Sequence, residues 1–303
     1  CLEAMISDDY STMTTGVLVP PALSMTLRGE FSNNTVNAVG INCTGYIAPN
    51  ILFDLAPLPG IIFTIDSMTF VGFETSHWKP GGIVRVSGAS STGAIVVQNV
   101  TVDYITARMG AIVGVDGNAH DGEIHISNSD FSHISVSSQG GLVFIPESAF
   151  GWHVTMRNIR VSHAFAPAGA AVAFVRHSHL VVDGGSTFVD THAESGFAGA
   201  VQVSNGSLVM AHVSFDDCSS TFTGCVGVTG ADGVVTNVTV VRAHSTQGDG
   251  AAFSVVSDCP LNASLTLTDV SVTYSEARHG GAVRVYGMAD CAPPRLIIAR
   301  STF

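Results

Sequence analysis

The stretch from Gly140 to Val161, GGLVFIPESAFGWHVTMRNIRV, decides the fold because it contains two elements that recur along the chain. One is a pair of small residues followed by a short apolar run, here GGLV. The other is the eight-residue pattern apolar-x-apolar-x-polar-any-x-apolar, here VTMRNIRV. Its further copies are FTIDSMTF from Phe63, IVVQNVTV from Ile95, IHISNSDF from Ile124, LVMAHVSF from Leu208, GVVTNVTV from Gly233, LTLTDVSV from Leu265 and LIIARSTF from Leu296, with a looser copy, LVVDGGSTF, from Leu180.

The small-residue element lies between these copies and has the same period of about 28 residues. Two independent elements that share one period indicate stacked structural repeats. The members of the small-residue element other than Gly140 begin at Gly81, Gly110, Ala170, Gly199, Gly224, Gly250 and Gly280.

The apolar residues within each copy alternate with period two, which predicts strands rather than helices. Small residues fit a tight corner, where glycine has access to positive φ. The polar fifth position interrupts the alternation and predicts a bend between two strands, because Asn and Asp tolerate the left-handed conformation. Stacked repeats align these bends in a column: Ser67, Asn99, Asn128, Asn158, His212, Asn237, Asp269 and Arg300.

Two or three short strands per repeat match one coil of a parallel β-helix, in which strands of successive coils pair and apolar side chains stack inside. A β-propeller blade needs about 40 residues or more, which exceeds this period. A β-sandwich keeps no single period over nine units. The sequence therefore predicts an all-β solenoid of about nine coils over residues 51–303. Residues 1–50 are predicted to form an N-terminal cap with irregular first strands, at Ser24 to Leu27 and Val39 to Ile41.

The GG[AI]V runs and the φ-x-φ-x-N-x-x-[FV] pattern (φ, any apolar residue) resemble right-handed parallel β-helix proteins of the pectin-lyase-like superfamily. Within that superfamily the chain is most similar to repeat-rich surface and adhesin-type proteins with GGA[IV] motifs. The resemblance covers about Ile51 to Phe303 and implies the architecture. It implies little about function, since this fold hosts lyases, hydrolases, adhesins and fibre proteins.

The charge of the chain disfavours several classes of partner. Charged residues make up 12% of the sequence and the net charge is −12, whereas soluble proteins average about 25% charged residues. Lys79 is the only lysine. Nucleic acid and anionic membrane surfaces are poor partners, because both are bound by clustered Lys and Arg. Membrane insertion is not expected, since no apolar run is long enough to span a bilayer.

The cysteines and the N-x-S/T sequons favour an extracellular or cell-surface glycoprotein over a bacterial export product without glycans. The sequons begin at Asn33, Asn42, Asn99, Asn205, Asn237 and Asn262. Asn99 and Asn237 coincide with the bends, so they are weaker candidates for glycan attachment than Asn205 and Asn262.

The cysteine spacing predicts three disulfides, with six buried free thiols as the alternative. One pair follows its small-residue element by eight to ten positions in neighbouring coils, which lie within disulfide reach. A second pair is seven residues apart, and the third staples the cap. The predicted pairs are Cys259 with Cys291, Cys218 with Cys225, and Cys1 with Cys43.

A column of polar residues about seven positions before the small-residue corners is a candidate site. Three histidines in consecutive coils, His133, His163 and His192, suggest a metal or pH-sensitive stripe. The favoured alternative is a corner that accepts any mid-sized polar residue, so neither a metal nor a cofactor is expected. The column reads Thr75, Asp103, His133, His163, His192, Asp217, His244 and Tyr274.

The resemblance also implies where a polygalacturonate hydrolase would carry its residues. Asp216-Asp217, His279-Gly280 and Arg284 match parts of that pattern. No N-x-D precedes them in the right place, no R-x-K follows, and the acids lie two coils from His279. The calcium-dependent lyases need several carboxylates on one face to bind Ca²⁺, and the sequence pattern shows no such cluster. No catalytic residue is therefore expected.

The aromatic residues predict a core rather than a sugar-binding face. Trp78 and Trp152 are the only tryptophans and lie about two and a half coils apart. No stacked stripe of aromatic residues is expected outside the inward-facing apolar positions of the repeat.

The sequence thus predicts a non-catalytic, extracellular structural or adhesive module that can serve as a subunit of a surface fibre or end-to-end assembly. We expect partners to be further copies of the chain, packed head to tail with the coil near Phe303 against the next molecule's first coil, or neighbouring surface proteins and glycans. One alternative is a polysaccharide lyase or glycoside hydrolase. The other is a carbohydrate-binding surface module.

Overall fold

The chain forms a parallel β-solenoid of about eight turns, and no helix occurs in the part of the chain that is described. The computed structural model describes residues 17–19, 25–28, 40–42, 47–48, 53–55, 60, 62–75, 80–87, 93–258, 261–279, 281–287 and 292–303. Over these ranges no helix is long and apolar enough to cross a membrane. The predicted fold class is confirmed.

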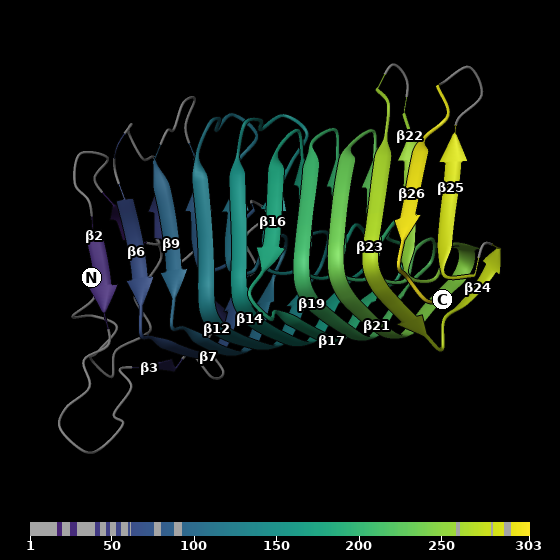
Figure 1. The fold of residues 1–303 in the computed structure, drawn as a ribbon. Coiled ribbons are helices and arrows are strands. Elements are labelled where there is room, and N and C mark those ends of the chain that lie inside the picture. Colours follow the sequence, from purple (N-terminus) through teal and green to yellow (C-terminus); the bar gives the residue numbers. More distant parts are fainter. Residues whose placement is uncertain are drawn as a thin grey trace.

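Two long sheets run along the solenoid, and their strands pair in parallel (Figure 1). Within the described ranges the first sheet has ten strands, in the order β1 (Val17–Val19), β5 (Phe53–Leu55), β8 (Val84–Val86), β11 (Val113–Val115), β13 (Val143–Ile145), β15 (Ala173–Arg176), β18 (Val201–Ser204), β20 (Val226–Thr229), β22 (Phe253–Ser257) and β25 (Val283–Gly287).

Over the described residues the second sheet has sixteen strands, because in several turns one strand precedes the bend and another follows it. They are β2 (Met25–Arg28), β3 (Gly40–Asn42), β4 (Ile47–Ala48), β6 (Ile62–Asp66), β7 (Thr69–Thr75), β9 (Ala94–Gln98), β10 (Thr101–Ala107), β12 (Glu123–Val136), β14 (His153–Ala166), β16 (His179–Asp183), β17 (Thr187–Ala193), β19 (Ser207–Ser220), β21 (Asp232–Asp249), β23 (Ser264–Thr273), β24 (Glu276–His279) and β26 (Arg295–Ala299).

The strand register follows the sequence repeat copy by copy. The first residue of each eight-residue copy pairs with the first residue of the next copy, in the series Phe63, Ile95, Ile124, Val154, Leu180, Leu208, Gly233, Leu265 and Leu296. The looser copy from Leu180 takes its regular place, and its extra residue falls in the Gly184-Gly185 turn between β16 and β17. The repeat therefore specifies the register.

The described residues form a solenoid of about eight turns, close to the nine or so that the sequence predicts. Complete turns run from β5–β7 to β22–β24, and β25 and β26 belong to a ninth turn whose second half is reduced to the Ser271–Thr302 bridge. Upstream, β1 to β4 pair in parallel with β5, β6 and β7. The early strands predicted at Ser24 to Leu27 and Val39 to Ile41 correspond to β2 and β3, and both pair with the turn that follows them.

Inward positions of each repeat form one continuous core. The last residue of each eight-residue copy is buried from Phe70 to Val272, and Phe188 stacks on Phe215 with ring centroids 5.1 Å apart. Trp152 is fully buried, and its Nε1 donates a hydrogen bond to the carbonyl of Ala119. Burial of aromatic and β-branched side chains from every turn stabilises the stack.

The predicted first bend is confirmed at all eight polar fifth positions, each of which has positive φ, from 47° at Arg300 to 56° at His212. Asn, Asp and Ser bear this conformation at lower cost than apolar residues. Side chains also connect successive bends. Asn99 Nδ2 donates to Asp66 Oδ1 at 2.9 Å, and Arg300 forms two hydrogen bonds with Asp269.

Two separate physical requirements explain the small residues of this element. Gly140 has φ of +62°, as expected for a tight corner. Its neighbour Gly141 has no positive φ, but a Cβ there would collide with the backbone carbonyl of Ala171 on the next turn. Gly199 and Gly224 are constrained in the same way, by the carbonyls of Gly224 and Ala251. Close approach of successive turns therefore requires glycine as often as positive φ does.

Candidate functional site: an exposed ring column and groove

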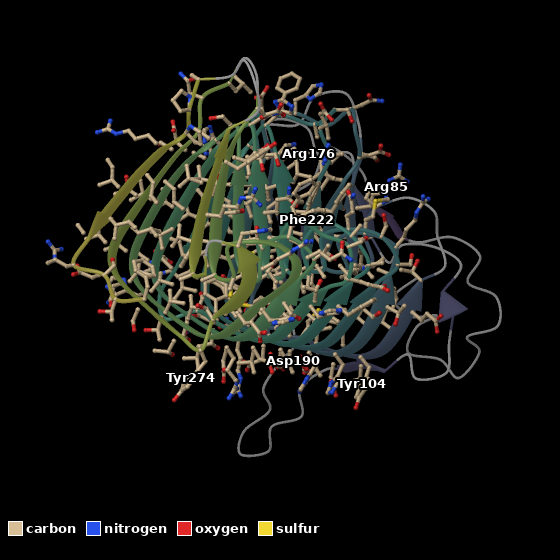
Figure 2. All side chains as sticks on the ribbon, turned by 90° about the vertical axis from the view of Figure 1, so that its right-hand side faces the viewer. Arg85, Tyr104, Arg176, Asp190, Phe222 and Tyr274 are labelled. Atoms are coloured by element: carbon tan, nitrogen blue, oxygen red, sulfur yellow. A yellow bond between two sulfur atoms is a disulfide. The ribbon has the colours of Figure 1, made fainter. Side chains whose placement is uncertain are left out.

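The strands of the second sheet bend a second time, five residues after the first bend in the regular copies. This second bend column also has positive φ and comprises Gly72, Tyr104, His133, His163, Asp190, Asp217, Arg242 and Tyr274. Its side chains lie along one edge of the solenoid, where Figure 2 shows Tyr104, Asp190 and Tyr274 in the view along the axis. Apart from Gly72, each member of the column presents its side chain to solvent.

The predicted polar column was wrong at four of its eight positions, Thr75, Asp103, His192 and His244. The predicted column counts back from the small-residue corners, and the number of residues between the second bend and the next corner varies from turn to turn. The number of residues between the first and second bends is constant in the regular copies. His192 lies two residues beyond Asp190 and pairs with Phe165. The predicted stripe of three histidines is therefore not formed.

Three consecutive members of the second bend column stack on one another. Tyr104 lies on His133 with ring centroids 4.2 Å apart and an interplanar angle of 5°, and His133 lies on His163 at 4.9 Å and 20°. Tyr104 is 57% exposed. We call these three residues the ring column. An exposed aromatic stripe thus exists, contrary to the sequence-based expectation, which considered only tryptophan and phenylalanine.

Carboxylates orient both imidazoles of the ring column. His133 Nδ1 donates to Asp103 Oδ1 at 2.8 Å, and His163 Nδ1 donates to Asp190 Oδ2 at 2.7 Å. Because a carboxylate only accepts, Nδ1 carries the proton in both rings. Partial burial raises the pKa of Asp103, but hydrogen bonds from His133 and Ser132 outweigh this and bring the pKa below its usual value.

A groove runs beside the ring column, parallel to the solenoid axis, with a volume of about 430 Å³. Its floor is the outward row that follows the second bend, in which Glu74, Thr106, Ser135 and Phe165 pair from turn to turn. We call it the axial groove. It is lined by Gly72, Phe73, Glu74, Tyr104, Thr106, His133, Ile134, Ser135, His163 and Phe165.

Other stacked rings lie outside the core. His153 and His179 stack at 4.8 Å, and His120 and Phe150 at 4.0 Å. Phe197 and Phe222 stack at 5.2 Å with 52% and 42% of their surface exposed. Stacking of equivalent positions from turn to turn therefore places aromatic rings on the surface as well as inside.

The residues implied by the resemblance to polygalacturonate hydrolases lie in different columns. Asp217 occupies the second bend column, and Asp216 forms an ion pair with Arg242 on the next turn, with a 2.6 Å separation. His279 pairs instead with Asp249 at the end of β21, and the Arg284 guanidinium lies over the ring of Tyr286. The register does not bring these acids and His279 together.

Cys218 and Cys225 form a disulfide with their Cα atoms 5.2 Å apart, and both residues are fully buried. It connects β19 to the corner before β20, as the sequence predicted for this pair. The partners in the other two predicted pairs, Cys1 with Cys43 and Cys259 with Cys291, lie outside the described residues. A disulfide is typical of proteins that fold outside the reducing cytoplasm.

The predicted glycan acceptors occupy different environments. Asn99, Asn237 and Asn262 are exposed, the first two at first-bend positions. Asn205 is half-buried, and its Oδ1 is buried without a hydrogen-bond partner. Asn42 ends β3, and Asn33 lies outside the described residues. Occupancy of all six sequons remains a prediction.

The part of the chain that is described contains no group of three or more His, Cys, Asp or Glu side chains that could hold a metal ion. Trp78 lies outside the described residues.

Comparison with known proteins finds no matching family model, no similar curated protein and no similar solved structure. The chain is therefore classified by its architecture, as a parallel β-solenoid.

Proposed function

We propose that this chain is a non-catalytic adhesive module of an extracellular or cell-surface protein. The observation that carries the proposal is the ring column of Tyr104, His133 and His163, which lies exposed beside the axial groove. Exposed aromatic rings that make no contact with the core are typical of binding surfaces.

The solenoid suits such a surface because successive turns repeat at the spacing of paired strands, about 4.8 Å. Equivalent side chains therefore form a regular line rather than a closed pocket. A regular line is complementary to an extended, repetitive ligand, and the backbone pairing between turns holds it rigid. Mechanistically, the module contributes preorganised contacts and no chemical step.

The extracellular location is supported by the Cys218–Cys225 disulfide and by the six sequons of the sequence. We further propose kinship with the surface and adhesin-type members of the pectin-lyase-like superfamily, with the right-handed winding that this implies. The repeat motifs support this kinship. Self-association and contacts with neighbouring surface proteins are the partner classes that fit an adhesive module.

The separate columns of Asp217 and His279 support binding without turnover. The experiment is incubation of the purified chain with pectate, alginate and neutral polysaccharides, followed by an assay for new chain ends. We expect none. Light scattering over a range of concentrations and binding to immobilised glycans then measure adhesion. Release of new ends contradicts the proposal, as does the absence of both self-association and glycan binding.

A further inference from the structure

Two aromatic rings that line the axial groove each have one face that is not stacked on another ring. Phe165 stacks on His192 at 5.6 Å, which covers one face of the Phe165 ring. Its other face points toward Ser135, the residue paired with it on the preceding turn, whose side chain is small. Both residues line the groove, so this second face is available to a ligand.

The same arrangement occurs at the other end of the groove. One face of Tyr104 is covered by His133. The position before Tyr104 in the second bend column is Gly72, which contributes no side chain over the opposite face. The groove therefore has an uncovered aromatic face at each end, one of Tyr104 and one of Phe165. Both ring planes lie across the solenoid axis.

The groove also offers hydrogen-bonding groups without partners. The hydroxyls of Thr106 and Ser135 make no hydrogen bond within the described residues, and neither does Nε2 of His133 or His163. Three inter-turn steps separate Glu74 from Phe165, which corresponds to about 14 Å at the spacing of parallel strands. A ligand in the groove thus meets polar groups at every turn.

The charge of the lining selects among ligands. Glu74 is the one acidic side chain in the lining, and the lining contains no lysine or arginine. Asp103 and Asp190 lie directly behind the imidazoles. A carboxylate-bearing ligand such as a uronate would meet these acidic groups with no lysine or arginine in the lining to pair with it, and its binding would be disfavoured.

We propose that the axial groove binds a neutral oligosaccharide, with the apolar face of one pyranose ring stacked on Phe165 and its hydroxyls bonded to Ser135, Thr106 and the histidine Nε2 atoms. A sugar fits this groove because its floor combines the ring of Phe165 with the hydroxyls of Thr106 and Ser135, so that one face of the ligand can stack while its own hydroxyls are hydrogen-bonded. The inference deepens the proposed adhesive function and rests on it.

The test is isothermal titration calorimetry with neutral oligosaccharides of glucose, mannose, galactose or xylose, and with oligogalacturonate of matched length. We expect at least one neutral oligosaccharide to bind and oligogalacturonate to bind about tenfold more weakly or not at all. Phe165→Ala should weaken binding about tenfold, the upper range for loss of a stacking contact.

Two further variants separate loss of the site from loss of the fold. Ser135→Tyr places a ring where the sugar would lie, so it should abolish binding without lowering the thermal midpoint. Phe197→Ala removes an exposed aromatic ring elsewhere and should leave the affinity unchanged. Circular dichroism checks that each variant keeps its strands.

Tighter binding of oligogalacturonate, binding unaffected by both Phe165→Ala and Ser135→Tyr, or failure of every neutral oligosaccharide to bind would each overturn the inference. These outcomes leave the adhesive function in place if the chain self-associates and releases no chain ends. Cleavage of a glycan would overturn the proposed function instead, while the groove variants would still report where the glycan binds.

Discussion

Asn158 donates a hydrogen bond from its side-chain amide to Oδ1 of Asn128 on the preceding turn, 2.8 Å away, and both residues have positive φ. One residue type thus meets two demands at the first bend. Its short polar side chain tolerates the left-handed backbone, and the amide links one turn to the next. This relationship explains why asparagine recurs at the fifth position of the repeat.

Replacement of Asn158 should separate these two contributions. Asn158→Ala forces a Cβ-bearing residue without a polar group into the left-handed region and should lower the free energy of unfolding by about 1–2 kcal/mol. Asn158→Gly loses the same hydrogen bond but adopts this backbone freely, so the loss should be smaller. Urea denaturation of both variants measures the difference. Equal destabilisation would show that the hydrogen bond, and not the backbone, sets the residue preference.

Glycine at position 141 should be required for steric reasons. A Cβ at Gly141 would collide with the carbonyl of Ala171, so Gly141→Ala must push two turns apart and should cost about 3 kcal/mol. The control is Gly185→Ala, where φ is +80° but no atom lies within 4 Å of the new Cβ. It should cost about 1–2 kcal/mol. A smaller loss for Gly141→Ala than for Gly185→Ala would contradict the close-approach explanation.

The fold was predictable from the sequence because the constraints on it are chemical and local. Inward positions must be apolar in every turn, and the first bend favours Asn and Asp, so both leave a visible period. The second bend has the same backbone conformation but is occupied by residues as different as Gly72, Tyr104, His163 and Arg242. These side chains point into solvent, so packing imposes no common residue type on them.

The candidate site was predicted only in part for the same reason, because the predicted column contained His133 and His163 but not Tyr104. Its rings belong together only because the register stacks them, and the alignment on the small-residue corners shifted four positions of that column. The constant five-residue distance from the first bend, as between Asn128 and His133, was present in the sequence and would have identified the column. The exposed face of Phe165 depends on the size of the residue in the neighbouring turn.

Buried and exposed phenylalanines should differ sharply in their effect on stability. Phe215 is 1% exposed and stacks on Phe188 in the core, so Phe215→Ala should cost about 3–5 kcal/mol through lost burial and a residual cavity. Phe222 is 42% exposed, and Phe222→Ala should cost less than about 1 kcal/mol. Denaturation midpoints of the two variants provide the comparison. A large effect at Phe222 would mean that the surface stack with Phe197 supports the fold.

The carboxyl of Asp103 should report on the ring column through its titration. Burial raises its pKa, yet the hydrogen bonds from His133 and Ser132 lower it below the ordinary value of 3.8. A folded-state pKa below the unfolded one means that the carboxylate stabilises the fold above pH 3.8 and loses this contribution as the pH falls through the folded pKa. Because Asp103→Asn has no carboxylate at this position, its free energy of unfolding should lack this pH-dependent loss.

Carbon-13 NMR of the carboxyl resonances measures the effect directly. In His133→Gln the pKa of Asp103 should rise toward 3.8, because the imidazole hydrogen bond and charge are both removed. His179→Gln serves as the control, since His179 stacks on His153 in a different column and bonds to Ser207. If the pKa of Asp103 is the same in His133→Gln as in the unsubstituted chain, the imidazole does not hold this carboxylate in its charged form, and the ring column is oriented by stacking alone.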